Sequence, residues 1–243
     1  MTMHVPPAPL PAVLGIVGGT GPESTVDYYR LLLARFHERG CAANPHLFLH
    51  SVDNFRLLAL ANAGDWAGMA TYLADAFAPL ERAGAQIGLI AANTPHVVFD
   101  EVAARTTLPL VSIVEATCAA VRARGLRRVA LLGTRFTMTG GFYPPVAARH
   151  GIELVVPTPD DLAYVHHVYV DEMIPGQFRP ESRDGVLAVI ERLRRDTGVE
   201  AAILGGTELP ILLRGAPEPL PLLDTTRIHV EAAVEAALAA GPA

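Results

Sequence analysis

The chain has 243 residues, of which 51% are hydrophobic and 18% are charged, and its formal net charge is −6. This composition is typical of a globular protein and argues against disorder. The acidic balance and the shortness of the arginine pairs argue against a nucleic-acid-binding protein, and no apolar run reaches the roughly 18 residues of a membrane span. The first residues do not resemble a signal peptide, so we expect a cytoplasmic location.

All 19 basic residues are arginine, and the chain therefore contains no lysine. Schiff-base catalysis and the anchoring of pyridoxal phosphate both need a lysine amine, so both are excluded. The two cysteines, Cys41 and Cys118, have neither the spacing of a metal site nor that of a disulfide framework. We expect both thiols to be reduced.

Short apolar segments typical of buried strands alternate along the chain with longer segments of helical periodicity. Strands are predicted at residues 12–18, 46–52, 86–91, 109–113, 128–133, 152–156, 200–205 and 220–224. Helices are predicted, among other places, at residues 22–38, 65–83, 115–124, 181–194 and 226–240. This alternation indicates an α/β protein whose sheets are parallel and carry helices on both faces.

Similar loops follow strands at matching places in the two parts of the chain. The loops are Gly18-Gly19-Thr20, Ala92-Asn93-Thr94, Gly133-Thr134 and Gly206-Thr207-Glu208. The interval between the first two nearly equals the interval between the last two, which predicts a duplicated α/β unit. We therefore expect two similar three-layer halves related by a pseudo-twofold axis.

The halves are predicted to be residues 1–113 with about 218–243, and residues 114–217. The C-terminal helix is expected to return to the first half. Because ligands bind beyond the carboxyl ends of parallel strands, the loops of both halves should line one cleft between them.

The segment Gly18 to Thr25 is rich in glycine but fits neither common nucleotide-binding pattern. A P-loop requires a lysine, and Ser24 stands where the dinucleotide pattern requires glycine or alanine. Pro22 marks the start of a helix instead, and the free amides before it could hold a carboxylate.

Several polar residues near these loops are candidate ligand contacts, each with a structural alternative. Thr94 is placed to cap a helix whose first residue is Pro95, so Asn93 and the helix-start amides could hold an anion. His96 could touch the ligand or pack locally. Glu208 could be a base or could hold its loop.

Two further groups of charged residues invite a functional reading. Arg56 could bind a carboxylate or lie in solvent. The cluster His166, His167, Asp171 and Glu172 looks like a metal site, but no second group of ligands accompanies it, and we predict no metal.

Eight strings in order along the chain resemble the aspartate/glutamate racemase family. They are GIVGGTGPESTVDYYR, HSVDNF, AANTPH, LLGTRFTMTGGFY, VHHVY, FRPESR, ILGGTEL and DTTRIH. The resemblance implies a cytoplasmic homodimer that needs no cofactor and acts on small amino dicarboxylates. It places around the substrate Thr20, Asn93, Thr94, Thr134, Thr137, Thr207 and Glu208, and we expect Gly19 there as well.

The sequence departs from the family pattern at two positions. The resemblance implies a cysteine before Asn-Thr in the first half and another before Thr-Glu in the second, where this chain has Ala92 and Gly206. Racemisation needs one group that removes the α-proton and a second that returns a proton on the opposite face. Each such group contributes roughly 10²- to 10⁴-fold, so losing both costs about 5–11 kcal/mol of barrier. Ordinary racemisation is therefore expected to be lost.

Three interpretations follow from this loss. The protein is a pseudoenzyme or sensor that binds a small carboxylate or amino acid; or it is a lyase, decarboxylase or isomerase that uses Glu208, His96 or a threonine hydroxyl; or the two residues were introduced into a racemase. Returning cysteine to positions 92 and 206 together is expected to restore racemisation. Cys41 and Cys118 could replace the missing thiols only if the fold brought them into the cleft.

Overall fold

The computed structural model describes residues 11–241 and contains two parallel sheets of four strands each. The first sheet has the order β2-β1-β3-β4, and the second has the equivalent order β6-β5-β7-β8. The strands are β1 (Leu14–Gly18), β2 (Leu47–Ser51), β3 (Ile87–Ile90), β4 (Leu110–Val111), β5 (Arg128–Gly133), β6 (Glu153–Val155), β7 (Ala201–Gly205) and β8 (Leu222–Asp224). Every predicted strand contains one of them, and the predicted fold class of two similar parallel α/β halves is confirmed.

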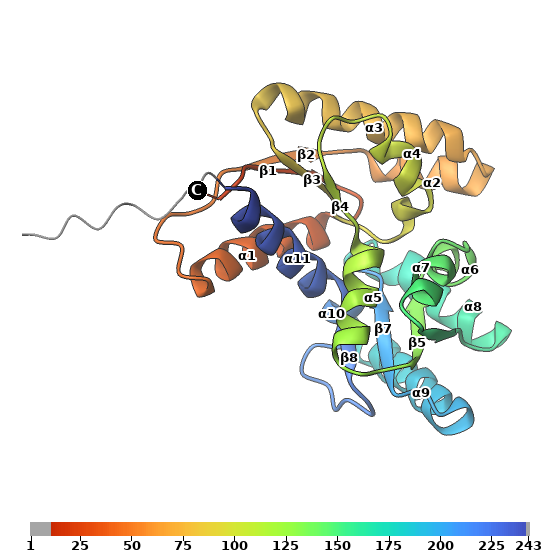
Figure 1. The fold of residues 1–243 in the computed structure, drawn as a ribbon. Helices are drawn as coiled ribbons and strands as arrows, with labels where there is room; N and C mark the ends of the chain where they lie inside the picture. Colours follow the sequence, from red (N-terminus) through yellow and green to blue (C-terminus); the bar gives the residue numbers. More distant parts are fainter. Residues whose placement is uncertain (1–10, 242–243) are drawn as a thin grey trace, which may run out of the picture.

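Helices cover both faces of each sheet (Figure 1). Those of the first half are α1 (Pro22–Glu38), α2 (Asn54–Ala63), α3 (Trp66–Ala83), the 3₁₀ helix η1 (Thr94–Val98) and α4 (Phe99–Ala103). Those that follow are α5 (Ile113–Ala123), α6 (Arg135–Thr139), α7 (Tyr143–Arg149), α8 (Pro159–His167), the π-helical turn η2 (Val168–Met173), α9 (Pro180–Thr197), α10 (Leu209–Leu212) and α11 (Thr225–Ala240). Within residues 11–241, none of the helices has the length and apolarity needed to cross a bilayer.

The first sheet separates two hydrophobic clusters because neighbouring residues of a strand point to opposite faces. Leu14 and Ile16 of β1 pack with α1 and α11, whereas Val17 packs with α2, α3 and α4. Figure 1 shows α2, α3 and α4 above this sheet and α1 and α11 below it. The layers hold the strand ends, and the loops that follow them, in fixed positions.

The second sheet is built in the same way. Val129 and Leu131 of β5 pack with α5 and α7, and Ala130 and Leu132 pack with α8, η2 and α9. The two central strands β5 and β7 pair from Val129 and Ala201 onwards and end together at Gly133 and Gly205. Their following loops therefore start side by side.

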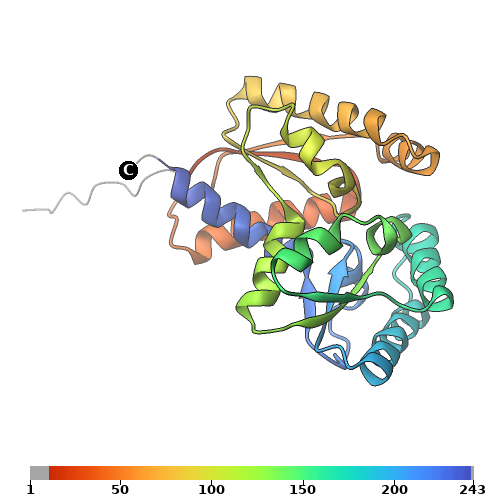
Figure 2. The same ribbon diagram turned by 45° about the vertical axis from the view of Figure 1, so that its right-hand side comes forward.

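Helix α11 joins the two halves. It lies beside α1 and α5, and its residues Val230, Ala233 and Val234 are part of the core beneath the first sheet (Figure 2). Strand β8, however, pairs with β7 in the second sheet. The chain thus returns to the first half only after Asp224, a few residues later than the expected boundary at about 218.

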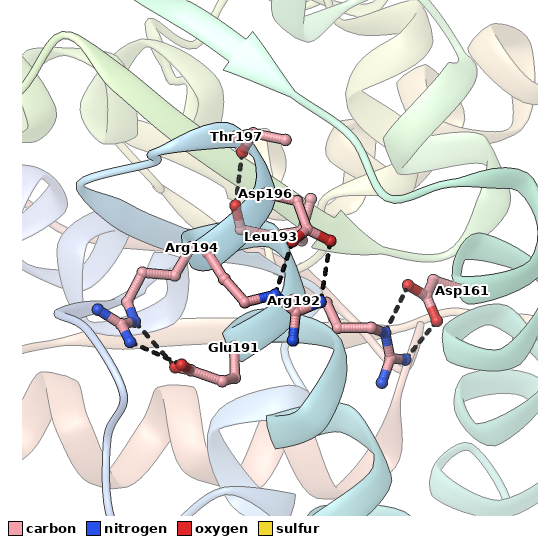
Figure 3. A network of polar contacts seen from close by, with 8 residues as sticks. Asp161, Glu191, Arg192, Leu193, Arg194, Asp196 and Thr197 are labelled. Atoms are coloured by element: carbon pink, nitrogen blue, oxygen red, sulfur yellow. Dashed lines mark hydrogen bonds and ion pairs between the residues drawn. The ribbon is translucent and has the colours of Figure 1, made fainter.

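Charged side chains on the outer face of α9 pair with one another or with α8 (Figure 3). Arg194 contacts Glu191 at 2.6 Å, and Arg195 contacts Asp196 at 2.7 Å. Arg192 reaches across to Asp161 of α8, with 3.1 Å between Nε and Oδ2. These arginines lie on the outer surface of the second half, and none of them lines the pocket described below.

Helix α1 depends on burial of one face. Tyr28, Leu32 and Phe36 recur at intervals of four residues and are fully buried against the first sheet and α11. We expect Leu32→Ala to lower the free energy of unfolding by about 2–5 kcal/mol, because it removes buried methyl groups and leaves a cavity. Urea unfolding measures the loss, and the exposed neighbour Arg30 gives the control: Arg30→Ala should change stability by about 0.5 kcal/mol or less. Equal losses in both variants would contradict the packing of α1 described here.

Candidate active site

A pocket of about 140 Å³ lies where loops from the carboxyl ends of both sheets meet. Of the residues predicted from the sequence, those that line it are Thr20, Ala92, Asn93, Thr94, Thr134, Gly206, Thr207 and Glu208. They follow strands β1, β3, β5 and β7, which are the central strands of the two sheets. An engineered cavity of about 150 Å³ holds one benzene-sized molecule, so this pocket has room for a small organic acid.

Three threonines link the halves at the bottom of the pocket. The hydroxyl of Thr94 in the first half lies 3.1 Å from that of Thr134 and 3.2 Å from that of Thr137 in the second. Thr134 also caps α6 by accepting a hydrogen bond from the backbone N–H of Thr137. Thr137 is buried and, unlike the other two threonines, does not line the pocket itself.

The expected helix cap at Thr94 is wrong. The segment that starts there is a 3₁₀ helix, Asn93 occupies the capping position, and no side chain accepts a hydrogen bond from the helix start. The hydroxyl of Thr94 points across the cleft instead, where it meets the threonines of the other half.

Asn93 lines the pocket, but its amide group is already bound on both sides. Its Nδ2 donates to the hydroxyl of Thr225 at 3.1 Å, and its Oδ1 accepts from the hydroxyl of Tyr143 at 2.6 Å. Tyr143 belongs to α7 of the second half, and Thr225 begins α11. Asn93 therefore holds the η1 loop against two other helices, and ligand binding is at most a second role.

Two predicted residues lie away from the pocket. Gly19 has φ = +83°, a left-handed backbone conformation that favours glycine, and its N–H donates to the hydroxyl of Thr25 at 2.8 Å. His96 is fully buried, with Nδ1 at 2.8 Å from the carbonyl of Ala92 and Nε2 accepting from the N–H of Ile113 at 3.1 Å. Burial lowers the pKa of His96 to about 3, so the ring is neutral, and both nitrogens are used. This arrangement removes His96 from the candidate proton carriers.

Tyr169 occupies the space beside Gly206. A Cβ atom added to Gly206 would collide with ring carbon Cε2 of Tyr169 and would lie 2.7 Å from its hydroxyl oxygen. The tyrosine is in η2 and lines the pocket. Any side chain at position 206 would therefore have to displace the tyrosine ring. Sequence reasoning missed this residue, although it stands in the VHHVY string.

The Tyr169 hydroxyl donates a hydrogen bond to the carboxylate of Glu208. The same oxygen, Oε2, accepts from the Thr207 hydroxyl at 3.0 Å, and the other oxygen packs on Gly21 of the first half. Burial raises the pKa of the Glu208 carboxyl above its ordinary value of 4.5, although the hydrogen bonds from Tyr169 and Thr207 oppose this shift. Burial and the charge of Glu208 also raise the pKa of Tyr169, so this side chain is a protonated phenol.

Neither cysteine lines the pocket. Cys118 is buried in α5 among the core residues of the second half, and burial raises the pKa of its thiol to about 12. Cys41 packs at the edge of the core beneath the first sheet. Both thiols are thus outside the site, and among residues 11–241 the ionisable residues that line it are Tyr169, Glu208 and His166.

The residues of the suspected metal cluster point to different partners. His166 lines the pocket and accepts a hydrogen bond from the N–H of Arg135 at Nδ1, so a neutral ring carries its proton on Nε2. His167 pairs with Asp171 at 2.7 Å, and Glu172 accepts from Ser182. Within residues 11–241, no three such side chains come together as a metal site.

Residues 17–233 match the Asp/Glu/hydantoin racemase family. The chain belongs to this family. Solved structures agree: a candidate Asp/Glu racemase from Yersinia pestis is 35% identical with a TM-score of 0.83, over 93% of this chain and 99% of its own. An aspartate racemase homologue from Pyrococcus horikoshii OT3 is 35% identical with a TM-score of 0.78, over 92% of this chain and 98% of its own. The broad-specificity amino-acid racemase RacX of Bacillus subtilis is 22% identical over 93% of this chain and 99% of its own.

In this racemase-family chain, the buried Glu208 makes stability depend on pH. An acid whose pKa is raised by folding contributes stability that is fully present below its unfolded pKa and is lost as the pH rises through its folded pKa. We therefore expect the wild type to lose stability relative to Glu208→Gln as the pH rises from about 4.5 towards neutrality. Urea unfolding of both proteins across this range measures the difference, and a difference that stays constant with pH would contradict the burial of an ionisable carboxyl.

Proposed function

We propose that the pocket binds a small amino acid or dicarboxylate and that ordinary two-thiol racemisation is lost. The observation that carries this proposal is that Ala92 and Gly206, one from each half, line the same pocket as the threonines that the family resemblance assigns to the substrate. Neither residue has an atom that can carry a proton. We further propose, from the resemblance alone, that the protein is a cytoplasmic homodimer without a cofactor.

The packing of Tyr169 supports a pocket adapted to the absence of a side chain at position 206. A simple replacement of cysteine by glycine in a racemase would leave a void, and buried voids destabilise proteins. Here the tyrosine ring fills the space and its hydroxyl is hydrogen-bonded to Glu208. The fit between Gly206 and Tyr169 therefore favours a pocket that functions with these two residues. It argues against a racemase into which glycine alone was introduced at position 206.

The same geometry supports one alternative, a catalyst that acts on a single face of its ligand. The Tyr169 hydroxyl lies near the place from which a side chain at 206 would work, and Glu208 can exchange protons with it. The first half offers no matching group at Ala92. Such a pocket could move a proton on one side of a carbon atom, as lyase, decarboxylase or isomerase chemistry requires, but could not invert that carbon.

We expect neither enantiomer of aspartate or glutamate to be racemised. Proton NMR in D₂O follows the α-proton, and chiral chromatography follows the configuration. An unchanged α-proton indicates that no proton is removed, and exchange with retained configuration that is lost in Tyr169→Phe indicates the one-face catalyst. Exchange accompanied by inversion would refute the proposed loss of racemisation.

Restoring the two cysteines requires a third change. Because residue 206 has no room for a Cβ beside Tyr169, we expect Ala92→Cys with Gly206→Cys to fold poorly or remain inert. Adding Tyr169→Ala removes the ring and should raise racemisation of an amino acid that the pocket binds by at least roughly 10²-fold over the double variant. The matched control is Tyr169→Ala alone, which should show no racemisation. A folded triple variant that binds substrate and stays inert would mean that positions 92 and 206 are not the proton-transfer positions.

A further inference from the structure

One wall of the pocket is apolar and is built mainly by one face of α2. The residues of this helix that line the pocket recur at helical spacing: Asn54, Leu57, Leu58, Ala61 and Asn62. Met69 of α3, Phe136 of α6, Val170 of η2 and Ile174 extend the wall. The two asparagines bring neutral amides that can form hydrogen bonds, so these lining residues are mainly apolar and carry no charge.

Cations are absent from the lining. The chain has no lysine, and no arginine within residues 11–241 lines the pocket. The two arginines next to lining residues in the sequence rest on aromatic rings: the Arg56 guanidinium is 4.3 Å from the centroid of Tyr72, and that of Arg135 is 5.5 Å from the centroid of Phe136. The suggestion that Arg56 binds a substrate carboxylate thus finds no support in its position.

Other lining residues suit the two charged groups of an amino acid. Thr94 and Thr134 bring hydroxyls that contact each other, and His166 carries an N–H, so a single carboxylate can find neutral donors there; the Thr20 hydroxyl already donates to the carbonyl of Ala91. Glu208 is the one carboxyl among the lining residues and can accept from an ammonium group. A ligand with a second carboxylate would add negative charge beside Glu208 with no cation to balance it.

We infer that the ligand is an α-amino acid with a small aliphatic side chain, and that the apolar face of α2 excludes acidic side chains. This inference rests on the proposed amino-acid site and narrows its ligand class. Burial of aliphatic carbon against Leu57, Leu58 and Met69 stabilises such a ligand, whereas an acidic side chain would lose its hydration there with no cation to balance its charge and only neutral asparagine amides as donors.

Leucine and aspartate provide a matched pair of probes, because their side chains have the same branching and the same number of heavy atoms. Isothermal titration of the full chain with both enantiomers of each should give at least about tenfold tighter binding for leucine of one configuration than for either aspartate. Tighter binding of aspartate would overturn the inference and leave the proposed amino-acid site standing. Binding of neither probe would overturn the inference and the proposed site together.

A variant of the wall tests the cause of the selectivity. Leu58 is half-buried in the pocket wall, and Leu58→Arg should weaken leucine binding and strengthen aspartate binding, each by about tenfold or more. Phe55 is 80% exposed on the same helix and does not line the pocket, so Phe55→Arg adds the same charge outside it. If the ratio of leucine to aspartate affinity changes equally in both variants, the overall charge of α2 decides the selectivity. That result would overturn the assignment of the selectivity to the residues of α2 that line the pocket.

Discussion

The amide of Asn93 holds the two halves of the molecule together at the point where the site is formed. One end of this amide is bound to Tyr143 and the other to Thr225, and all three side chains are buried. Since a buried amide that loses its partners costs about 1–3 kcal/mol per group, the loop between β3 and α4 is fixed in one position. The adjacent threonine cluster depends on this loop, because Thr94 belongs to it.

Much of the architecture could be predicted from the sequence, because apolar runs and glycine-threonine loops report strand ends directly. The duplication could be read from the spacing of those loops, and most of the loop residues do meet at one pocket. Short elements such as α6 and α10 could not be predicted, because four or five residues are too few for a periodicity to emerge. The boundary near residue 218 was placed too early, since β8 is a short strand whose sheet is decided by its pairing with β7.

The roles of individual polar residues were less predictable. His96 and Asn93 are residue types that often bind ligands. Their polar atoms, however, form hydrogen bonds with backbone and side-chain groups that are distant in the sequence. The contact between Tyr169 and Gly206 joins residues in different elements, and no local pattern announces it. Glycine at position 206 shows in the sequence only that a side chain is absent, whereas the structure shows that the ring of Tyr169 occupies the space beside it. The tertiary contact changes the meaning of the residue.

The position of α11 has a consequence for how the protein is made. Four of its residues complete the core beneath the first sheet, although the whole second half precedes this helix along the chain. During synthesis, β1, α1 and β3 therefore keep one apolar face partly uncovered until α11 has emerged from the ribosome, after the strands of the second half. The core of the first half is therefore completed only when α11 packs on it, although most of that half is synthesised first.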